Sequence, residues 1–495
     1  MTPATGGRSL ARRTLANMGL TAMVRLATLA LQLCANIVLA RNLSSADYGI
    51  VGYAQVFITL LSILSEFGLN SAAIQSRQLS PRMLHTGFTL RMLLGLTAFA
   101  AAFVAAPHCA TLLGEPGVGD AMKLLAAGFL INGLAFVPSV RILRALDYRK
   151  FAAAQMAAAT VNAAITIAMA QADFAFWSIV VGNVAATAAS ALVLNLMVKE
   201  RLHLVLEPES ARHYLDFGGH LFLASTLTFM VMNLDTFMVG TLMGSAALGY
   251  YALALTWGNK LCETFASIVN SVLFPTFARI QEDLPRLRAA YLKSLEMVAF
   301  LAVGGYLTLF AVSEDFLIHM LGAGTEKWRA SLMTLRILCA YGLIRALLEP
   351  VGSVVMAVGG IPVLVRANLA AAAAIAMLIY PALTAGGIEG AALVVTVGYA
   401  CQYLVFLPAL KRRLDIGVRD LMVRLRHPLV AAVATLMLVL PLRDAGLLGS
   451  GPTRFSVTAL LCGVIYAAMF GLVSRGAAYR ELYNLVRSRR QDHDR

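Results

Sequence analysis

Long apolar runs alternate with short polar connections along most of the chain. Most runs hold about 20 residues, the length that an α-helix needs to cross a bilayer core of roughly 30 Å. A membrane β-barrel needs apolar and polar residues that alternate with a period of two, and these runs lack that period. The pattern predicts an all-α polytopic membrane protein with about fourteen spans, at 16–40, 48–70, 84–106, 121–140, 151–171, 174–197, 214–243, 246–275, 291–312, 330–357, 362–385, 388–410, 427–442 and 455–474.

The basic residues are distributed unevenly between these spans. The chain has 40 Lys and Arg against 26 Asp and Glu, which gives a formal net charge of +14. Most of the lysines and arginines fall in every second connection, starting with Arg8, Arg12 and Arg13 before the first span. Cytoplasmic loops carry such an excess, so we expect both termini to be cytoplasmic. The positive charge therefore indicates topology and not a nucleic-acid partner.

Other sequence features limit the chemistry. Most of the six cysteines lie inside apolar runs, which indicates packed thiols and not a disulfide framework. The first apolar run is longer than the core of a signal peptide, so we interpret it as a retained span. The chain has no glycine-rich phosphate loop followed by Lys-Ser or Lys-Thr, which argues against ATP hydrolysis. We expect no enzyme activity, no cofactor and no metal site.

An internal repeat appears at an offset of 200 residues. The segment NLSSADYGIVGYA at 42–54 aligns without gaps with LMGSAALGYYALA at 242–254. Each copy lies between the first and second spans of a group of six, and both groups begin on the same side. The repeat is therefore parallel, and its symmetry axis is expected to run along the membrane normal, with a binding cleft between the two copies.

The repeat predicts six segments of chain. They are an N-terminal lobe at 1–197, a cytoplasmic linker at 198–213, a C-terminal lobe at 214–410, a basic amphipathic segment at 411–426, two further spans at 427–474 and a basic cytoplasmic tail at 475–495. The segment at 411–426 is expected to lie near anionic lipid headgroups of the inner leaflet.

Several charged residues fall inside the spans. A charge at the middle of a span costs about 2.5–3.5 kcal/mol on insertion scales, and such residues usually face a cavity or a partner. Lys260 and Glu263 lie three residues apart and Arg345 and Glu349 four apart, so each pair shares a helix face. We expect these faces to line the cleft. The charged residues inside the spans are Arg25, Glu66, Arg91, Asp235, Lys260, Glu263, Arg336, Arg345 and Glu349.

Two stretches, 36–75 and 234–283, resemble the polysaccharide transporter family. This family holds the Wzx-like oligosaccharide flippases of the multidrug/oligosaccharidyl-lipid/polysaccharide exporter superfamily. The matching pieces are LARNLS at 39–44, YG at 48–49, FGL at 67–69 and VLFP at 272–275. Where the family pattern has an acid followed directly by Gly-Leu, this chain has Glu66 with Phe67 inserted. The resemblance spans the first eight helices and implies a V-shaped fold of two helical lobes.

The resemblance also implies a function and its partners. It implies transport of an oligosaccharide repeat unit linked to polyprenyl pyrophosphate from the inner to the outer leaflet of a bacterial inner membrane, by alternating access. The product is expected to enter exopolysaccharide, capsule or lipopolysaccharide synthesis. A repeat-unit polymerase and a chain-length regulator are further expected partners besides the lipid bilayer.

The family resemblance implies roles for the charged residues inside the spans. An arginine fork bonds two phosphate oxygens at once, and lysine acts as a point charge. The expected pyrophosphate-binding residues are Arg25, Arg91, Lys260 and Arg345. The expected residues for ion coupling or pairing are Glu66, Asp235, Glu263 and Glu349. The alternative for every one of them is structural pairing between helices, and Arg336 has the further option of snorkelling outward.

Three other functions stay open at this point. A multidrug antiporter of the same superfamily predicts an acid-rich cleft and usually twelve spans, whereas this chain has a small basic excess inside its spans. A peptidoglycan-lipid flippase also has fourteen spans, and VLFP at 272–275 favours the sugar-repeat branch. A membrane-embedded polymerase or acyltransferase needs large outer loops or a His/Asp constellation within a span, and the sequence has neither.

Overall fold

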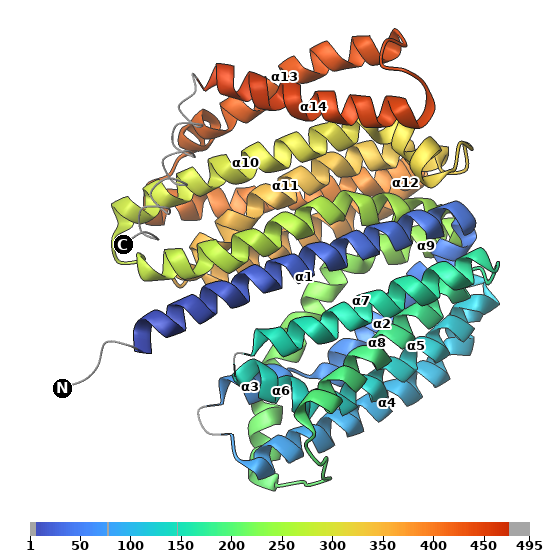
Figure 1. Ribbon diagram of the computed structural model, residues 1–495, viewed down its shortest axis with the longest axis vertical. Coiled ribbons are helices and arrows are strands. Elements are labelled where there is room, and N and C mark those ends of the chain that lie inside the picture. The colour runs from blue at the N-terminus through green and yellow to red at the C-terminus, as the bar shows by residue number, and fades with distance from the viewer. Residues whose placement is uncertain (1–5, 77–78, 146, 475–495) are drawn as a thin grey trace. The chain divides into compact units, whose positions relative to one another are not determined.

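The computed structural model describes residues 6–76, 79–145 and 147–474. These residues form helices joined by short connections, with no strand among them (Figure 1). The helices form two compact units, and the chain passes from one to the other after Gly249. The predicted all-α membrane class is confirmed. The lobe boundaries expected from the repeat stay a prediction.

The described residues of the first unit form eight complete helices and the start of a ninth. Their bounds are α1 Gly6–Asn42, α2 Ser45–Glu66, α3 Leu69–Gln75, α4 Pro81–Leu113, α5 Pro116–Leu134, α6 Phe136–Arg144, α7 Tyr148–Gln171 and α8 Trp177–Val198, followed by α9 Pro208–Arg279. Local sequence sets several of the starts. Ser44 caps α2 in a capping box with Asp47, and Ser80 caps α4 just before a proline. A serine at this position accepts from the free backbone amides of the first turn.

The linker between α8 and α9 is fastened to the first unit. Arg141 on α6 donates two hydrogen bonds to Glu200, at 3.0 and 2.8 Å. The backbone amide of Val205 donates to the hydroxyl of Thr89 on α4, at 3.0 Å. Tyr214, in the first turns of α9, is fully buried in an apolar core with Phe136. The chain from 200 to 214 is therefore held by side chains of α4 and α6.

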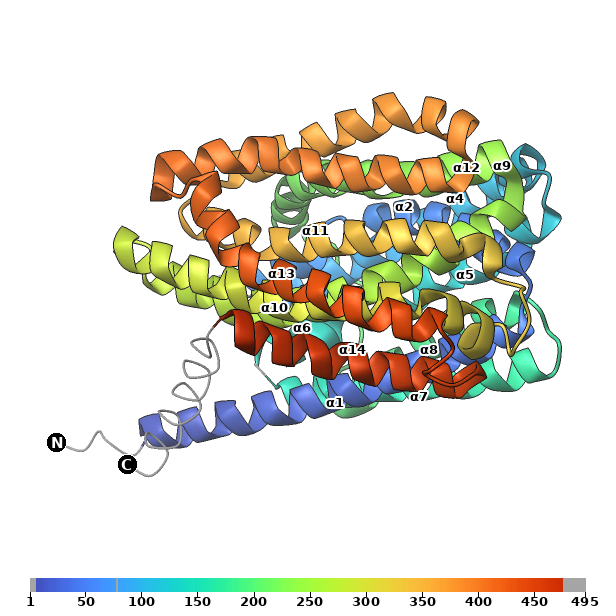
Figure 2. The same ribbon diagram turned by 90° about the horizontal axis from the view of Figure 1, so that it is seen from above.

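The second unit holds the rest of α9 and the remaining helices. Their bounds are α10 Leu284–Asp315, a π-helix Phe316–Leu321, a 3₁₀ turn Arg329–Ser331, α11 Leu332–Ala357, α12 Ile361–Leu414, α13 Val418–Asp444 and α14 Gly451–Val473. Helices α13 and α14 pack on each other and on α10 (Figure 2). Their contact is apolar, and Tyr466 of α14 donates a hydrogen bond to the carbonyl oxygen of Phe300 at 3.0 Å.

Helix α12 is a hairpin of two arms. The break is Gly387, whose φ of 57° and ψ of −141° lie outside the helical region. A Cβ atom on Gly390 would lie 2.7 Å from the carbonyl carbon of Ala382, and one on Gly398 would lie 2.5 Å from Ile375. The two arms therefore run antiparallel in direct contact, and glycine gives their backbones the room to approach.

The number of spans depends on how such breaks are treated. Among the described residues, eleven helices are long and apolar enough to cross a membrane, or up to twelve if the bent pair α5–α6 is one span. The expected count of fourteen is therefore not confirmed. It differs at α9 and α12, each of which the sequence divides into two spans. A non-helical glycine interrupts each of these helices, at Gly244 and Gly387.

The basic segment at 411–426 is divided between two helix ends. Helix α12 ends at Leu414 and α13 begins at Val418, so the segment is not one continuous helix. Between them, a hydrogen bond and the charge of Lys411 lower the pKa of Asp415. Arg288 of α10 pairs with Asp415 at 3.6 Å and with Asp420 at 3.2 Å. Contact of this segment with lipid headgroups stays a prediction, and the predicted tail at 475–495 lies outside the described residues.

Candidate functional site

Glu66 and Arg91 form an ion pair where α2 ends. Phe67 and Gly68 both have positive φ, at 42° and 68°, and this double left-handed turn stops α2 and redirects the chain into α3. Arg91 comes from α4, and its Nη2 lies 3.7 Å from the Glu66 Oε1. Arg91 is 4% exposed, and its Nε and Nη1 have no hydrogen-bond partner among the described residues. A buried cation is costly unless it is paired and hydrogen-bonded, so Arg91 depends on its contact with Glu66.

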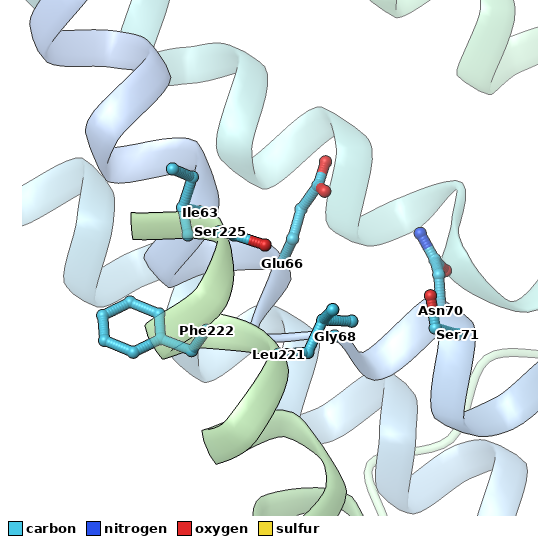
Figure 3. Close-up of a pocket in the computed structure, with 8 residues that line it drawn as sticks. All are labelled: Ile63, Glu66, Gly68, Asn70, Ser71, Leu221, Phe222 and Ser225. Atoms are coloured by element: carbon cyan, nitrogen blue, oxygen red, sulfur yellow. The ribbon is translucent and has the colours of Figure 1, made fainter. Parts of the chain in front are cut away.

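A cavity of about 100 Å³ lies beside this turn. Figure 3 shows Glu66 at the end of α2, Asn70 and Ser71 on α3, and the facing turn of α9. That turn approaches very closely, because a Cβ on Gly218 would lie 2.5 Å from the Phe67 ring. The cavity combines a carboxylate, an amide and hydroxyls with an apolar wall, and its lining residues are Ile63, Glu66, Gly68, Asn70, Ser71, Leu221, Phe222 and Ser225.

A second polar cluster lies within the second unit, around Arg345 of α11. Its Nη1 donates to the Asn259 Oδ1 at 2.8 Å and to the Tyr341 hydroxyl at 3.2 Å. The Tyr341 ring in turn packs edge-on against Tyr399 of α12, with 4.9 Å between centroids. Residues of α9, α11 and α12 thus fix one edge of the guanidinium. A fork held this way is pre-organised, so little side-chain entropy is lost when a ligand binds it.

The two predicted charge pairs lie on the helices that meet at this cluster, Lys260 and Glu263 on α9 and Arg345 and Glu349 on α11. Glu263 is exposed, whereas Lys260, Arg345 and Glu349 are half-buried. Two cations and two carboxylates therefore lie on neighbouring helices. Mutual compensation of this kind lowers the cost of placing charge inside a membrane.

The other two predicted residues lie apart from these clusters. Arg25 is exposed on α1. Asp235 is 3% exposed on the first part of α9, and the hydroxyl of Thr236 donates to its Oδ1 at 3.5 Å. Of the eight predicted site residues, four thus belong to each unit, and a cleft that joins them stays a prediction. Among the described residues no group of three or more His, Cys, Asp or Glu is arranged to hold a metal ion.

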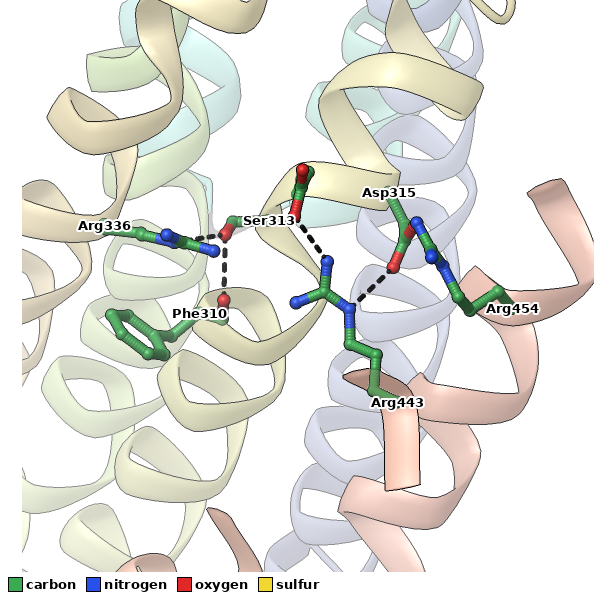
Figure 4. Close-up of polar contacts among 7 residues, drawn as sticks. Phe310, Ser313, Asp315, Arg336, Arg443 and Arg454 are labelled. Atoms are coloured by element: carbon green, nitrogen blue, oxygen red, sulfur yellow. Dashed lines mark hydrogen bonds and ion pairs between the residues drawn. The ribbon is translucent and has the colours of Figure 1, made fainter. Parts of the chain in front are cut away.

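The structure adds a charged network that was not predicted. Asp315, at the end of α10, is completely buried. It accepts from the Arg443 Nε of α13 at 3.1 Å and from the Arg454 Nε of α14 at 2.7 Å, while Arg443 also bonds Glu314 at 2.7 Å (Figure 4). Arg443 and Arg454 fall in the connection between the last two predicted spans, and an acid at a span end gives no unusual signal. This network joins three helices.

Arg336 lies near this network and is held inside the unit. Its Nε donates to the hydroxyl of Ser313 at 3.1 Å, and its guanidinium carbon lies 5.5 Å from the centre of the Phe310 ring. These contacts make Arg336 a packing residue between α10 and α11. Asn259 and Tyr341 were also missed, because both are uncharged and only their contact with Arg345 distinguishes them.

Sequence comparison relates the chain to proteins of polysaccharide synthesis. A family described as "Polysaccharide biosynthesis protein" matches residues 38–332. The lipopolysaccharide biosynthesis protein WzxC of Escherichia coli K12 is 26% identical over 407 residues, which cover 80% of each chain. The succinoglycan biosynthesis transport protein ExoT of Rhizobium meliloti is 23% identical over 327 residues, which cover 65% of each chain.

Structure comparison identifies the fold. A lipid II flippase, MurJ in an inward closed conformation, matches with a TM-score of 0.76 at 12% identity, covering 94% of this chain and 99% of that one. An inward-facing multidrug transporter of the MATE family matches with a TM-score of 0.60 at 15% identity, covering 79% of this chain and 98% of that one. At such identities the likeness shows a shared helical fold.

Proposed function

The chain belongs to the polysaccharide biosynthesis protein family, and we propose that it moves a lipid-linked oligosaccharide across a bacterial inner membrane for surface polysaccharide synthesis. The observation that carries this proposal is the family match over residues 38–332. The matched residues include the Glu66–Arg91 pair and the charged residues Lys260 and Glu263. The names of the relatives WzxC and ExoT refer to lipopolysaccharide biosynthesis and to succinoglycan biosynthesis transport.

The Arg345 cluster is the proposed site for the pyrophosphate. Arg345 is already oriented by Asn259 and Tyr341, and a planar fork suits phosphate oxygens. Lys260, the chain neighbour of Asn259, is proposed to supply a second cation. Glu263 and Glu349 balance these cations when no substrate is bound, so the site is not left with uncompensated positive charge inside the membrane.

The Glu66–Arg91 pair is the proposed coupling element, so Arg91, which the sequence assigned to the pyrophosphate, is proposed instead as the partner of Glu66. Glu66 faces the cavity at the end of α2, and Arg91 lies behind it with two open donors. Protonation of Glu66, or entry of another cation, weakens its attraction to Arg91. The pair therefore offers two discrete arrangements that an ion gradient can bias. Asp235 is proposed as a further residue for ion coupling. Arg25 is proposed as a further contact of the substrate along the transport path.

The surroundings of the protein complete the proposal. We propose that both termini are cytoplasmic, because the basic residues fall in alternate connections. The substrate carries a polyprenyl pyrophosphate, and a repeat-unit polymerase and a chain-length regulator act on the product. Movement of the anionic headgroup outward is favoured by an inside-negative potential, at about 2.3 kcal/mol per charge per 100 mV.

Deletion of the gene in its own bacterium tests the function. We expect loss of a surface polysaccharide and accumulation of a lipid-linked repeat unit on the cytoplasmic leaflet, both reversed by the wild-type gene. Leaflet position is read from the access of a membrane-impermeant glycosidase in intact cells and in inverted vesicles. Normal surface polysaccharide together with loss of resistance to organic cations would identify a drug antiporter instead.

A further inference from the structure

The two copies of the sequence repeat meet in the structure. Ser44 precedes α2 with an extended backbone, and Gly244, at the equivalent position, interrupts α9 with φ 83° and ψ 178°. Each copy therefore has a break followed by a new helix that begins at Ser45 or at Ser245. Gly49 and Gly249 lie one turn further along. All of these residues belong to the first unit.

The first turns of these two helices cross with reciprocal contacts. A Cβ atom on Gly49 would overlap the carbonyl oxygen of Ser245 and would lie 2.9 Å from its Cα. A Cβ atom on Gly249 would overlap the carbonyl oxygen of Ser45 and would lie 3.0 Å from its Cα. We call these four residues the Ser–Gly crossing. The glycine of each copy thus contacts the serine of the other copy, which is the reciprocal pattern of a twofold interface.

Only glycine permits this approach. At each contact a glycine Hα occupies the place of the Cβ and faces a serine carbonyl oxygen, which is a weak Cα–H···O contact. On each helix a serine and a glycine lie four residues apart. Small residues at this spacing let membrane helices touch through their backbones. Since both glycines are at equivalent repeat positions, the symmetry axis of the repeat passes through the crossing.

Further contacts near the Ser–Gly crossing hold α2 and α9 together. The hydroxyl of Ser245 donates to the Glu115 carboxylate at the start of α5. Tyr53 is completely buried against Gly240, where a Cβ would overlap the tyrosine ring. One turn further, Phe57 packs edge-on against Phe237, with 6.2 Å between centroids. Helix α2 is thus closed against α9 on both sides of the break at Gly244.

We propose that the Ser–Gly crossing closes the transport path at this end of α2, and that Gly49 and Gly249 are positioning residues for the closure. The inference rests on the proposed transport function. When two parallel repeat copies rock against each other, their ends separate on one side of the membrane at a time, so a contact between the copies at one end of the path forms and breaks in every cycle. The crossing is suited to opening, because it joins small residues through individually weak contacts and requires no change of side-chain rotamer.

A reversible cross-link tests whether the crossing opens. The chain carries Ser45→Cys and Ser245→Cys, with its six native cysteines changed to serine. Ser45 lies one helical turn, about 5.4 Å, from Gly49, which touches Ser245. A short bifunctional methanethiosulfonate therefore bridges the two introduced cysteines. We expect the bridged protein to export at least about tenfold less lipid-linked sugar than before bridging, and a reductant to restore export. Undiminished export by the bridged protein overturns the proposal.

Thiol labelling gives a second test that does not depend on any substrate. Ser245 is 8% exposed, so a single Ser245→Cys thiol reacts slowly with an impermeant maleimide applied from either side. Adding Gly49→Ala pushes the crossing apart, and we expect labelling about tenfold faster. The matched control is Gly128→Ala on α5, where a Cβ meets nothing within 4 Å. Equal labelling rates in the Gly49 and Gly128 variants contradict the proposal, even if the protein transports another substrate.

Discussion

Arg91 and Arg345 are both arginines of membrane helices, but the structure holds them in different ways. Arg91 is buried with two donors open and one long ion pair, whereas Arg345 already donates to Asn259 and Tyr341. An arginine held on one side can offer its remaining donors in a fixed direction. An arginine with open donors instead depends on a partner that can move. At the scale of the residue, Arg345 therefore suits substrate binding and Arg91 suits coupling to Glu66.

Replacement of Arg345 by lysine tests its role as a fork. Arg345→Lys keeps the positive charge and removes the planar pair of donors, so we expect export of the lipid-linked repeat unit to fall about tenfold, equal to about 1.4 kcal/mol of lost binding. Arg336→Lys is the control, because Arg336 lies on the same helix and its side chain donates to Ser313 and lies over the Phe310 ring. Equal export by the two variants at equal expression would contradict the role of Arg345.

At the scale of the element, three glycine-dependent features shape the helices. Gly387 folds α12 into a hairpin, Gly244 interrupts α9, and Gly68 follows Phe67 in the turn after α2. Hydropathy located the first two as boundaries between spans. It did not locate the turn at Phe67, because phenylalanine rarely adopts positive φ and the apolar run continues through it. Glu66 reaches the cavity only because of this turn.

The network at Asp315 predicts how α13 and α14 stay attached to α10. Asp315→Asn leaves Arg443 and Arg454 without their buried carboxylate, so we expect the free energy of unfolding in detergent to fall by about 3–5 kcal/mol. Susceptibility of the α13–α14 connection to protease gives a local readout. Glu326→Gln is the matched control, because its pair with Arg329 is largely exposed and such pairs contribute about 0–1 kcal/mol. Equal stability of both variants would show that apolar packing alone attaches these helices.

At the scale of the whole molecule, the sequence predicted the class better than the site. Runs of apolar residues and the family resemblance were sufficient for the helical membrane fold, since both depend on local pattern. Helix periodicity was sufficient to pair Lys260 with Glu263 on α9 and Arg345 with Glu349 on α11, and their grouping in one site stays a prediction. The partners Asn259 and Tyr341, and the network at Asp315, arise from contacts between helices far apart in sequence. No periodicity along one helix reports such contacts.

Transport by the purified protein in sealed liposomes tests the central claim most directly. The two probes are short-chain prenyl carriers of the same sugar, one linked through a pyrophosphate and the other through a monophosphate. Our account predicts that the wild-type protein moves the pyrophosphate probe at least about tenfold faster, and that Arg345→Ala removes this preference. Equal rates for the two probes, or a preference that survives in Arg345→Ala, would contradict it.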